Sequence, residues 1–246
     1  MEYSTKITRI ALLLLLGLSA GCTTLKSTDD TSRQISSDPL EGVNRAVYGF
    51  NTTADKVILR PVAKAYSYTV PKPVKTSISN FFNNLREPVN IVNNALQGKG
   101  YRALDSGYRF LINSSIGMLG LFEVANHYNI KPAREDFGQT LAAWGVKPGP
   151  YVMVPFLGPT NFRDGFGRIV QSSAYYAPSI ISDSDTTQIA LTAVDVVDTR
   201  ADFLGLDSAL DLQLDKYLFF KEAFEADRIN KIYDGNAPVQ QVEYDF

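Results

Sequence analysis

The 246-residue sequence has very few of the residue types from which metal centres and nucleophilic sites are built, with one cysteine, one histidine and one tryptophan. A single cysteine excludes both an internal disulfide and a cysteine-based zinc site. The formal net charge is −2, so no strong positive field is present to attract nucleic acid. We therefore expect no nucleic-acid partner and no bound metal.

Sequence motifs of common enzyme classes are also missing. The chain has no P-loop, no Gly-x-Ser-x-Gly elbow, no His-Glu-x-x-His pair and no dinucleotide-binding fingerprint. We interpret His127 as a surface or packing residue rather than a general base. Three acidic pairs are more simply explained as helix caps or solvated faces than as catalytic dyads: Glu135 with Asp136, Asp183 with Asp185, and Asp195 with Asp198. The sequence thus predicts a protein that is not an enzyme and that has neither catalytic residues nor a cofactor.

No apolar run is long enough to span a bilayer as a simple helix, but residues 1–21 have the layout of a secretion signal. Lys6 and Arg9 precede a short apolar stretch, and small residues then lead to Cys22. This order is typical of a bacterial lipobox, which predicts cleavage before Cys22 and its acylation, and two or more acyl chains anchor a protein stably. The alternative is an ordinary secreted protein with an incidental thiol. Thr23 stands where an aspartate would favour the inner membrane, so we expect the outer membrane of a diderm bacterium.

The composition changes twice after the lipidation site. Residues 22–37 are rich in Ser, Thr and Asp and predict a flexible tether. Residues 38–233 have the composition and apolar periodicity of a single helical domain, and residues 234–246 form a polar tail.

Apolar residues recur at steps of three and four within the domain, which predicts amphipathic helices. We expect Asp38 to cap the first helix, with Glu41 completing a capping box, and Pro61 to end it. Pro88 is expected to kink or break the second helix. The predicted helical segments are 39–60, 74–96, 101–116, 186–206 and 210–232.

The second helical segment carries an unusual number of asparagines opposite its apolar stripe: Asn80, Asn83, Asn84, Asn90, Asn93 and Asn94. Asparagine is a middling helix former, so its accumulation on one face needs an explanation. The asparagines either line a polar wall or face water, and the sequence leaves both open.

An irregular stretch from Gly145 to Arg168 interrupts the helices. It contains five glycines and four prolines, which cost about 1 and about 3 kcal/mol, respectively, in a helix interior. Residues 151–157 are nevertheless seven consecutive apolar or aromatic residues, so protein or lipid must surround them. We predict a small hairpin here, with strands over 140–144 and 151–156.

Two arrangements fit these segments equally well. In one, the helices bury their apolar faces against one another as an ordinary periplasmic bundle. In the other, several apolar faces point into one membrane leaflet and the polar faces surround a cavity. A helix with a polar asparagine face allows the second arrangement but does not demand it.

A series of short motifs follows in order over about residues 37–168: Asp38-Pro-Leu-Glu-Gly-Val-Asn-Arg45, Tyr48-Gly-Phe-Asn51, Arg60-Pro-Val-Ala63, Asn80-Phe-Phe-Asn-Asn-Leu-Arg-Glu-Pro88, Phe137-Gly-Gln-Thr-Leu141 and Pro155-Phe-Leu-Gly-Pro159. Together they resemble the MlaA/VacJ family of outer-membrane lipoproteins. The final third of the chain matches more weakly, and Trp144 stands where the family has a tyrosine.

The resemblance implies a mainly α fold: a ring of amphipathic helices lying in one membrane leaflet, with a small irregular or hairpin insert and an amphipathic channel. It implies a protein anchored at the periplasmic face of the outer membrane, beside a trimeric porin. Such a protein removes mislocalised phospholipid from the outer leaflet and passes it to a periplasmic lipid-carrier protein. The alternative is a structural, porin-associated lipoprotein that moves no lipid. A lipid hydrolase would need a nucleophile that the sequence does not provide.

The segment Gly145, Val146 and Lys147 is our candidate for a gate of the channel. It lies in the predicted hairpin turn, it contains a glycine, and it places a lone cation beside an apolar run.

Four residues of the first motif are candidates for the channel wall: Asn44, Arg45, Phe50 and Asn51. The alternative is that they form a helix-packing motif.

Overall fold

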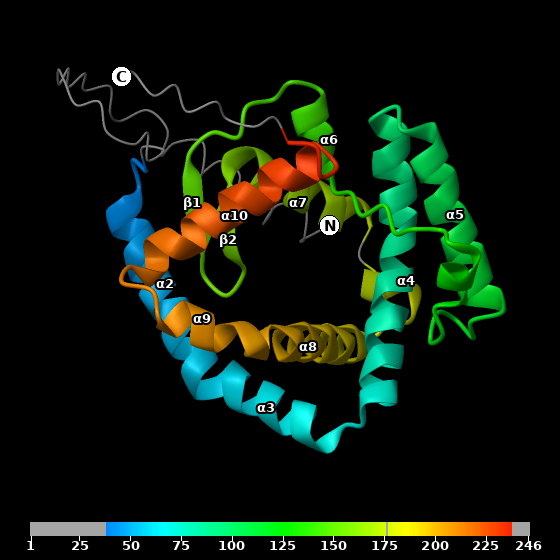
Figure 1. The fold of residues 1–246 in the computed structure, drawn as a ribbon, viewed down its shortest axis with the longest axis horizontal. Coiled ribbons are helices and arrows are strands. Elements are labelled where there is room, and N and C mark those ends of the chain that lie inside the picture. Colours follow the sequence, from blue (N-terminus) through cyan, green and yellow to red (C-terminus); the bar gives the residue numbers. More distant parts are fainter. Residues whose placement is uncertain (1–37, 176, 238–246) are drawn as a thin grey trace, which may run out of the picture. The chain divides into compact units, whose positions relative to one another are not determined.

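The structure, a computed structural model, describes residues 38–175 and 177–237. The predicted signal, Cys22, the tether and residues 238–246 of the tail lie outside the described residues. The expectation of a mainly α fold with a small hairpin is confirmed for the described part (Figure 1). No helix in that part is both long and apolar enough to cross a membrane.

The first helix is longer than the sequence predicts. It consists of α2 (Glu41–Ala54), a π-helical turn η2 (Asp55–Leu59) and α3 (Arg60–Thr69), so the predicted end at Pro61 is wrong. A proline in a helix lacks an N–H donor and its ring clashes with the carbonyl four residues earlier. The π-turn, closed by a bond from Arg60 N–H to the Asp55 carbonyl, directly precedes Pro61 and changes the bonding pattern there.

The predicted Asp38 cap is also wrong in detail. The residue at the N-cap of α2 is Leu40, which makes no side-chain capping bond. Asp38 instead accepts hydrogen bonds from the Asn44 amide (3.0 Å) and the Tyr217 hydroxyl. Its carboxylate also accepts from the Leu40 N–H (3.1 Å), so Asp38 caps the turn that leads into α2 and ties this end to a helix near the C-terminus.

The second and third predicted helices are confirmed as α4 (Lys72–Leu96) and α5 (Gly100–Ser115), which pack against each other. Pro88 lies inside α4 without ending it, so the expected break is absent. A connection containing the short 3₁₀ helix η3 (Val124–Tyr128) leads from α5 towards the irregular stretch.

The irregular stretch contains a hairpin, but not the predicted one. Residues 140–144 lie in and directly after helix α6 (Phe137–Ala143), and the strands are β1 (Tyr151–Val154) and β2 (Gly158–Asn161). The strands are antiparallel, with Tyr151 opposite Asn161. Asp136 caps α6 by accepting a bond from the Gln139 N–H, and Gly145, at φ +87°, ends it in a left-handed turn.

The C-terminal third is helical and its predicted helices are present with shifted ends. It contains α7 (Phe162–Ala174), η4 (Ala177–Ile180), α8 (Asp185–Asp202), η5 (Phe203–Leu206), α9 (Asp207–Asp211) and α10 (Lys216–Ile232). The last helix begins at Lys216 rather than Leu210, because Asp215 accepts a capping bond from the Leu218 N–H.

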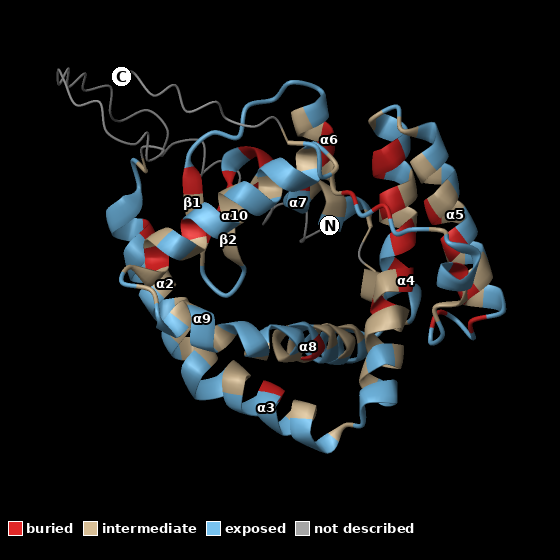
Figure 2. Ribbon diagram, in the orientation of Figure 1, coloured by how far each residue is buried: buried red, intermediate tan, exposed pale blue. Residues whose placement is uncertain are grey.

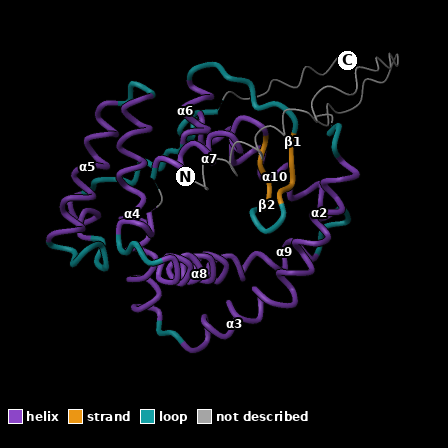
Figure 3. Tube along the Cα trace, turned by 180° about the vertical axis from the view of Figure 1, so that it is seen from behind, coloured by secondary structure: helices purple, strands orange, loops and turns teal. Residues whose placement is uncertain are grey.

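The helices and strands of residues 38–237 form a closed cycle of contacts, in which each element touches the next. From α2 the contacts pass to β1, then to β2, α10, α6, α4, α8 and α3, and return to α2 through η2. Figure 3 shows these elements from behind, with the strands confined to the hairpin beside α2 and α10.

The distribution of burial is the reverse of that in an ordinary water-soluble bundle (Figure 2). Among the described residues, eight hydrophobic residues are buried, against eighteen polar or charged ones. Large apolar side chains are widely exposed on α2, α3, α4, α5 and α7. In a protein folded in water the buried set is mostly apolar. Several described helices, α5 above all, therefore bury polar residues and expose apolar ones.

Candidate functional site

Helix α5 shows the inverted burial most clearly. The apolar stripe found in the sequence is exposed along its whole length: Tyr101, Leu104, Tyr108 and Leu111. The opposite side, with Ser106, Arg109 and Asn113, is buried. Since an exposed apolar face of this size is rare in a soluble monomer, the stripe has the character of a surface that meets an apolar partner.

The buried Arg109 organises the polar interior between α4 and α5. Its guanidinium donates to Glu87 on α4 (2.9 Å), to Glu123 and to the Ile130 carbonyl (2.6 Å). Burial lowers the pKa of Arg109, but the bonds to Glu123 and Glu87 outweigh this effect and raise it overall. The arginine therefore stays charged and is shared by two carboxylates.

Most asparagines of α4 do not face water, and their amides form hydrogen bonds with other parts of the chain. Asn84, Asn90, Asn93 and Asn94 are buried, and their amides hold neighbouring segments. Asn94 donates to the Ala133 carbonyl (3.0 Å), and the Asn90 oxygen accepts from the Glu135 N–H (3.1 Å). These bonds satisfy backbone groups of the non-helical segment 129–136, which would otherwise be unpaired in the interior.

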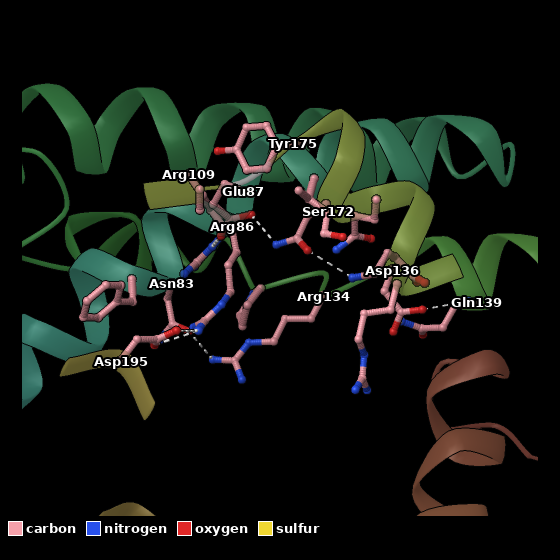
Figure 4. A pocket seen from close by; sticks show the side chains of 18 of the residues that line it. Asn83, Arg86, Glu87, Arg109, Arg134, Asp136, Gln139, Ser172, Tyr175 and Asp195 are labelled. Carbon is pink, nitrogen blue, oxygen red and sulfur yellow. Dashed lines mark hydrogen bonds and ion pairs between the residues drawn. The ribbon is translucent and has the colours of Figure 1, made fainter. Parts of the chain in front are cut away.

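A cavity of about 450 Å³ lies beside this polar interior. Its lining comes from α4, segment 132–136, α6, α7, η4, α8 and Lys231. Arg86 and Arg134 reach it from different segments and both donate to the Asn83 oxygen, at 3.4 and 3.3 Å (Figure 4). Tyr175 lines it as well, and its hydroxyl donates to the Leu85 carbonyl (2.6 Å). The volume is within the range of small-molecule sites.

A second polar cluster joins α6, α7 and α10. Arg228 on α10 donates to Asp136 (2.6 Å) and to Asp164 (2.9 Å). The helices approach closely at Gly138 and Gly167, since a Cβ on Gly167 would lie 2.6 Å from the Gly138 nitrogen. Burial raises the pKa of Asp136, but the bonds from Arg228 outweigh it and lower the pKa overall.

A buried ion pair lies in the irregular stretch. Arg163 donates to Asp164 at 2.8 Å, and both side chains are buried. Asn161, which caps α7, donates to the same carboxylate at 2.7 Å. The pair therefore fixes the start of α7 after β2.

Asn44 and Asn51 both bind the backbone of β1 and the residues after it. The Asn44 amide donates to the Tyr151 carbonyl and accepts from the Met153 N–H, at 3.1 and 2.8 Å. Asn51 does the same with the Val154 carbonyl and the Phe156 N–H, at 3.0 and 2.8 Å. The structure thus gives both residues a packing function, and the channel wall stays a prediction.

The other two candidates of the first motif lie apart from those amides. Arg45 is exposed, pairs with Glu41 and Asp215, and its guanidinium carbon lies 4.5 Å from the centre of the Tyr217 ring. Phe50 is exposed and packs edge-on against Phe156 at the tip of the hairpin.

The candidate gate follows α6 rather than lying in the hairpin turn. Gly145, Val146 and Lys147 are exposed. The Val146 N–H donates to the Leu141 carbonyl and the Gly145 N–H to the Ala142 carbonyl, which is a Schellman cap. The glycine is thereby explained as a helix end, and the gate stays a prediction.

Sequence reasoning missed the cavity with Arg86 and Arg134, and did not single out Arg109 or Arg228. No local signal identifies the two cavity arginines, because they meet from segments 48 residues apart. Arg109 had a partial signal: it and Arg102 are the two cations on the side of α5 opposite the apolar stripe, a side that becomes buried when the stripe faces outward.

Comparison with known proteins gives a consistent match. A model of the MlaA lipoprotein family matches residues 36–231. This chain belongs to the MlaA lipoprotein family. The intermembrane phospholipid transport system lipoprotein MlaA of Escherichia coli is 36% identical over 223 residues, which are 89% of this chain and 86% of that protein. The Haemophilus influenzae protein of the same name is 32% identical, over 94% of this chain and 92% of its own length.

The fold of the MlaA family is also recognised in a solved structure. A chain from work on the structural basis for maintenance of bacterial outer membrane lipid asymmetry superposes with a TM-score of 0.71 at 38% sequence identity. The match covers 81% of this chain and 100% of that chain. The mainly helical fold and the family thus agree.

Proposed function

We propose that this chain is an outer-membrane lipoprotein that removes mislocalised phospholipid from the outer leaflet and passes it to a periplasmic carrier. In this role it maintains the lipid asymmetry of the outer membrane without making or breaking a covalent bond. Cys22 carries the lipid anchor, and the domain lies on the periplasmic face beside a trimeric porin.

The observation that carries this proposal is the inverted burial of the described helices. Apolar side chains exposed on α2, α4, α5 and α7 gain about 25 cal/mol per Å² when they leave water for lipid. The hydrogen-bonded polar interior, by contrast, suits a head group that must be kept away from the acyl region. A ring of helices in one leaflet satisfies both requirements, and the closed succession of element contacts supports such a ring.

The family supports the substrate of the proposal. The named relatives belong to an intermembrane phospholipid transport system, and the matched structure concerns outer-membrane lipid asymmetry. In this proposal the segment Gly145, Val146 and Lys147 gates the channel. Asn44, Arg45, Phe50 and Asn51 belong to the channel wall.

The test is to remove the chain from its own bacterium and to measure phospholipid in the outer leaflet with an amine-reactive probe that does not cross the outer membrane. We expect labelling of surface phosphatidylethanolamine to rise without the chain and to return to normal when it is restored. A Cys22→Ser variant, which has no anchor, is expected not to restore it. Unchanged labelling in the deletion strain would contradict the proposal.

A purely structural, porin-associated lipoprotein is the rival function. It predicts that purified chain retains porin but no phospholipid, and that deletion lowers porin levels without changing surface phospholipid. Measuring porin and phospholipid in the same preparation by native mass spectrometry separates the two functions.

A further inference from the structure

We propose that the cavity between α4, segment 132–136, α7 and α8 binds the phosphate group of a phospholipid, through Arg134 and Arg168. This inference rests on the proposed function, because it assigns a seat for the lipid head group to two particular side chains. The charged side chains that line the cavity support this assignment.

Every carboxylate of the lining already forms an ion pair, in some cases with a cation that it shares with a second carboxylate. Asp195 pairs with Arg86, and the remaining pairs are Glu87 and Glu123 with Arg109, Glu135 with Lys99, and Asp136 with Arg228. Lys231 of the lining pairs in turn with Asp227. Each acidic side chain of the cavity therefore forms its ion pair with a residue other than Arg134 or Arg168.

Arg134 and Arg168 also line the cavity, and neither forms an ion pair with any residue in the described part of the chain. Arg134 makes one side-chain hydrogen bond, to the Asn83 oxygen at 3.3 Å. Both side chains are exposed, so their guanidinium groups are accessible from the cavity. The cavity consequently has two guanidinium groups that pair with no carboxylate of the described residues.

The position of Arg86 adds to the effect. Two guanidinium groups, those of Arg86 and Arg134, converge on the single oxygen of Asn83, and only that of Arg86 pairs with a carboxylate, Asp195 (Figure 4). Like charges that converge in this way repel each other unless an anion lies between or beside them. The guanidinium group of arginine donates two parallel N–H bonds, a geometry that fits two oxygens of a phosphate or of a carboxylate.

The neighbouring walls suit a lipid rather than a free ion. Phe82 and Tyr175 line the same cavity with Pro132 and Pro178, so apolar surface lies next to the two arginines. A phosphodiester with a glycerol backbone satisfies both parts of the lining, whereas inorganic phosphate uses only the charged part. Both ligands share the same anionic chemistry, and the experiment must separate them.

The experiment uses the full mature chain extracted in detergent from its own membrane. Phosphatidylglycerol, diacylglycerol and inorganic phosphate are each titrated, and binding is followed by native mass spectrometry. The test variant is Arg134→Gln with Arg168→Gln. The matched control is Lys64→Gln with Lys72→Gln, which removes two exposed cations that do not line the cavity.

We expect the test variant to bind phosphatidylglycerol about tenfold more weakly than the wild type, as the loss of charge-assisted hydrogen bonds implies. Binding of diacylglycerol, which lacks the phosphate, should be the same in both, and the control should match the wild type. Binding by the wild type should weaken as salt is raised, since exposed charges are screened.

A second variant tests the site through an expected increase in phosphatidylglycerol binding. Asp195→Asn removes the one carboxylate that neutralises Arg86, so we expect it to bind phosphatidylglycerol about threefold more tightly. Because this change removes no arginine, tighter binding cannot result from partial unfolding.

Three results would overturn the inference. Unchanged phosphatidylglycerol binding in the Arg134→Gln, Arg168→Gln variant would remove the arginines from the site. An equal loss of diacylglycerol binding, in a variant whose thermal unfolding matches that of the wild type, would mean that the two arginines do not recognise the phosphate. Displacement of the lipid by equimolar inorganic phosphate would assign the cavity to a free anion. If the double variant still restores lipid asymmetry in cells and binds lipid normally, the seat is wrong while the transport function stands.

Discussion

Arg109 and Glu87 form a salt bridge in which each side chain is only 3% exposed, with 2.9 Å between the guanidinium nitrogen and the carboxylate oxygen. Helices α4 and α5 are thus joined across their buried sides by opposite charges, while the apolar stripe of α5 points away from the joint. In a bundle folded in water, apolar side chains would make this contact.

Replacing Arg109 with leucine leaves Glu87 buried without its cation. Removal of one partner of a buried pair typically costs about 3–5 kcal/mol. We expect the Arg109→Leu variant to lose that much free energy of unfolding, measured by denaturation in detergent. Changing Glu87 to leucine as well should recover part of the loss, whereas Lys216→Ala, which breaks an exposed pair with Asp211, should cost less than about 1 kcal/mol.

The amides of Asn44 and Asn51 hold the hairpin against α2. The variant Asn44→Ala leaves the Tyr151 carbonyl and the Met153 N–H without these partners, which costs about 1–3 kcal/mol. We expect faster hydrogen exchange at Met153, with exchange in α5 unchanged. Thr53→Ala, on the exposed side of the same helix, should leave both unchanged, and slow exchange at Met153 in Asn44→Ala would contradict the prediction.

Substitutions of Gly145 distinguish its role as a helix cap from its proposed role in the gate. Its φ of +87° is left-handed, and a Cβ there would meet no atom within 4 Å, so an alanine would be disfavoured by the backbone alone. We expect Gly145→Ala to cost about 1–2 kcal/mol and Gly145→Asn less, measured by thermal unfolding. If Gly145→Asn keeps stability but loses transport, the segment acts as a gate; if transport follows stability in both variants, Gly145 is a helix cap.

The pair Arg45–Asp215 gives a pH dependence with a definite sign. Hydrogen bonds from Arg45 lower the pKa of Asp215 from 3.8 to about 2. A lowered pKa in the folded state means that the pair stabilises fully above pH 3.8 and that its contribution disappears as the pH falls to about 2. We expect Asp215→Asn to flatten the loss of stability in that interval. A variant whose acid unfolding is as steep as that of the wild type would show that the pair contributes nothing.

Much of the helical content could be predicted because apolar periodicity does not depend on which side faces the solvent. The stripe from Tyr101 to Leu111 correctly located α5, for example. The same periodicity could not tell whether the stripe is buried or exposed, since a helix has the same 3.6-residue repeat in either case. That difference depends on what surrounds the helix.

Helix ends and the hairpin were predicted less well, for identifiable reasons. Asp136 and Gln139 form the pattern of a capping box, and Gly145 has the place of a C-terminal cap, so α6 had local signals that the strand interpretation overlooked. Pro61 is a strong stop signal that the preceding π-turn overrides. The meeting of Arg86 with Arg134 depends on tertiary packing and has no local signal.

The π-turn between Asp55 and Leu59 also determines how the two halves of the long first helix are phased. Asn44 and Ala63 are the fully buried residues of α2 and α3, and they are 19 positions apart in the chain. At about 100° per residue, 18 positions complete five turns, so the one extra residue carried by the π-turn keeps both side chains on the same side. A one-residue deletion within 55–59 would therefore remove the extra residue and keep the two side chains on the same side. A one-residue deletion elsewhere between Asn44 and Ala63 would keep them on the same side only if the π-turn reverted to an α-turn. The first helix thus has a built-in position for length variation in homologous chains.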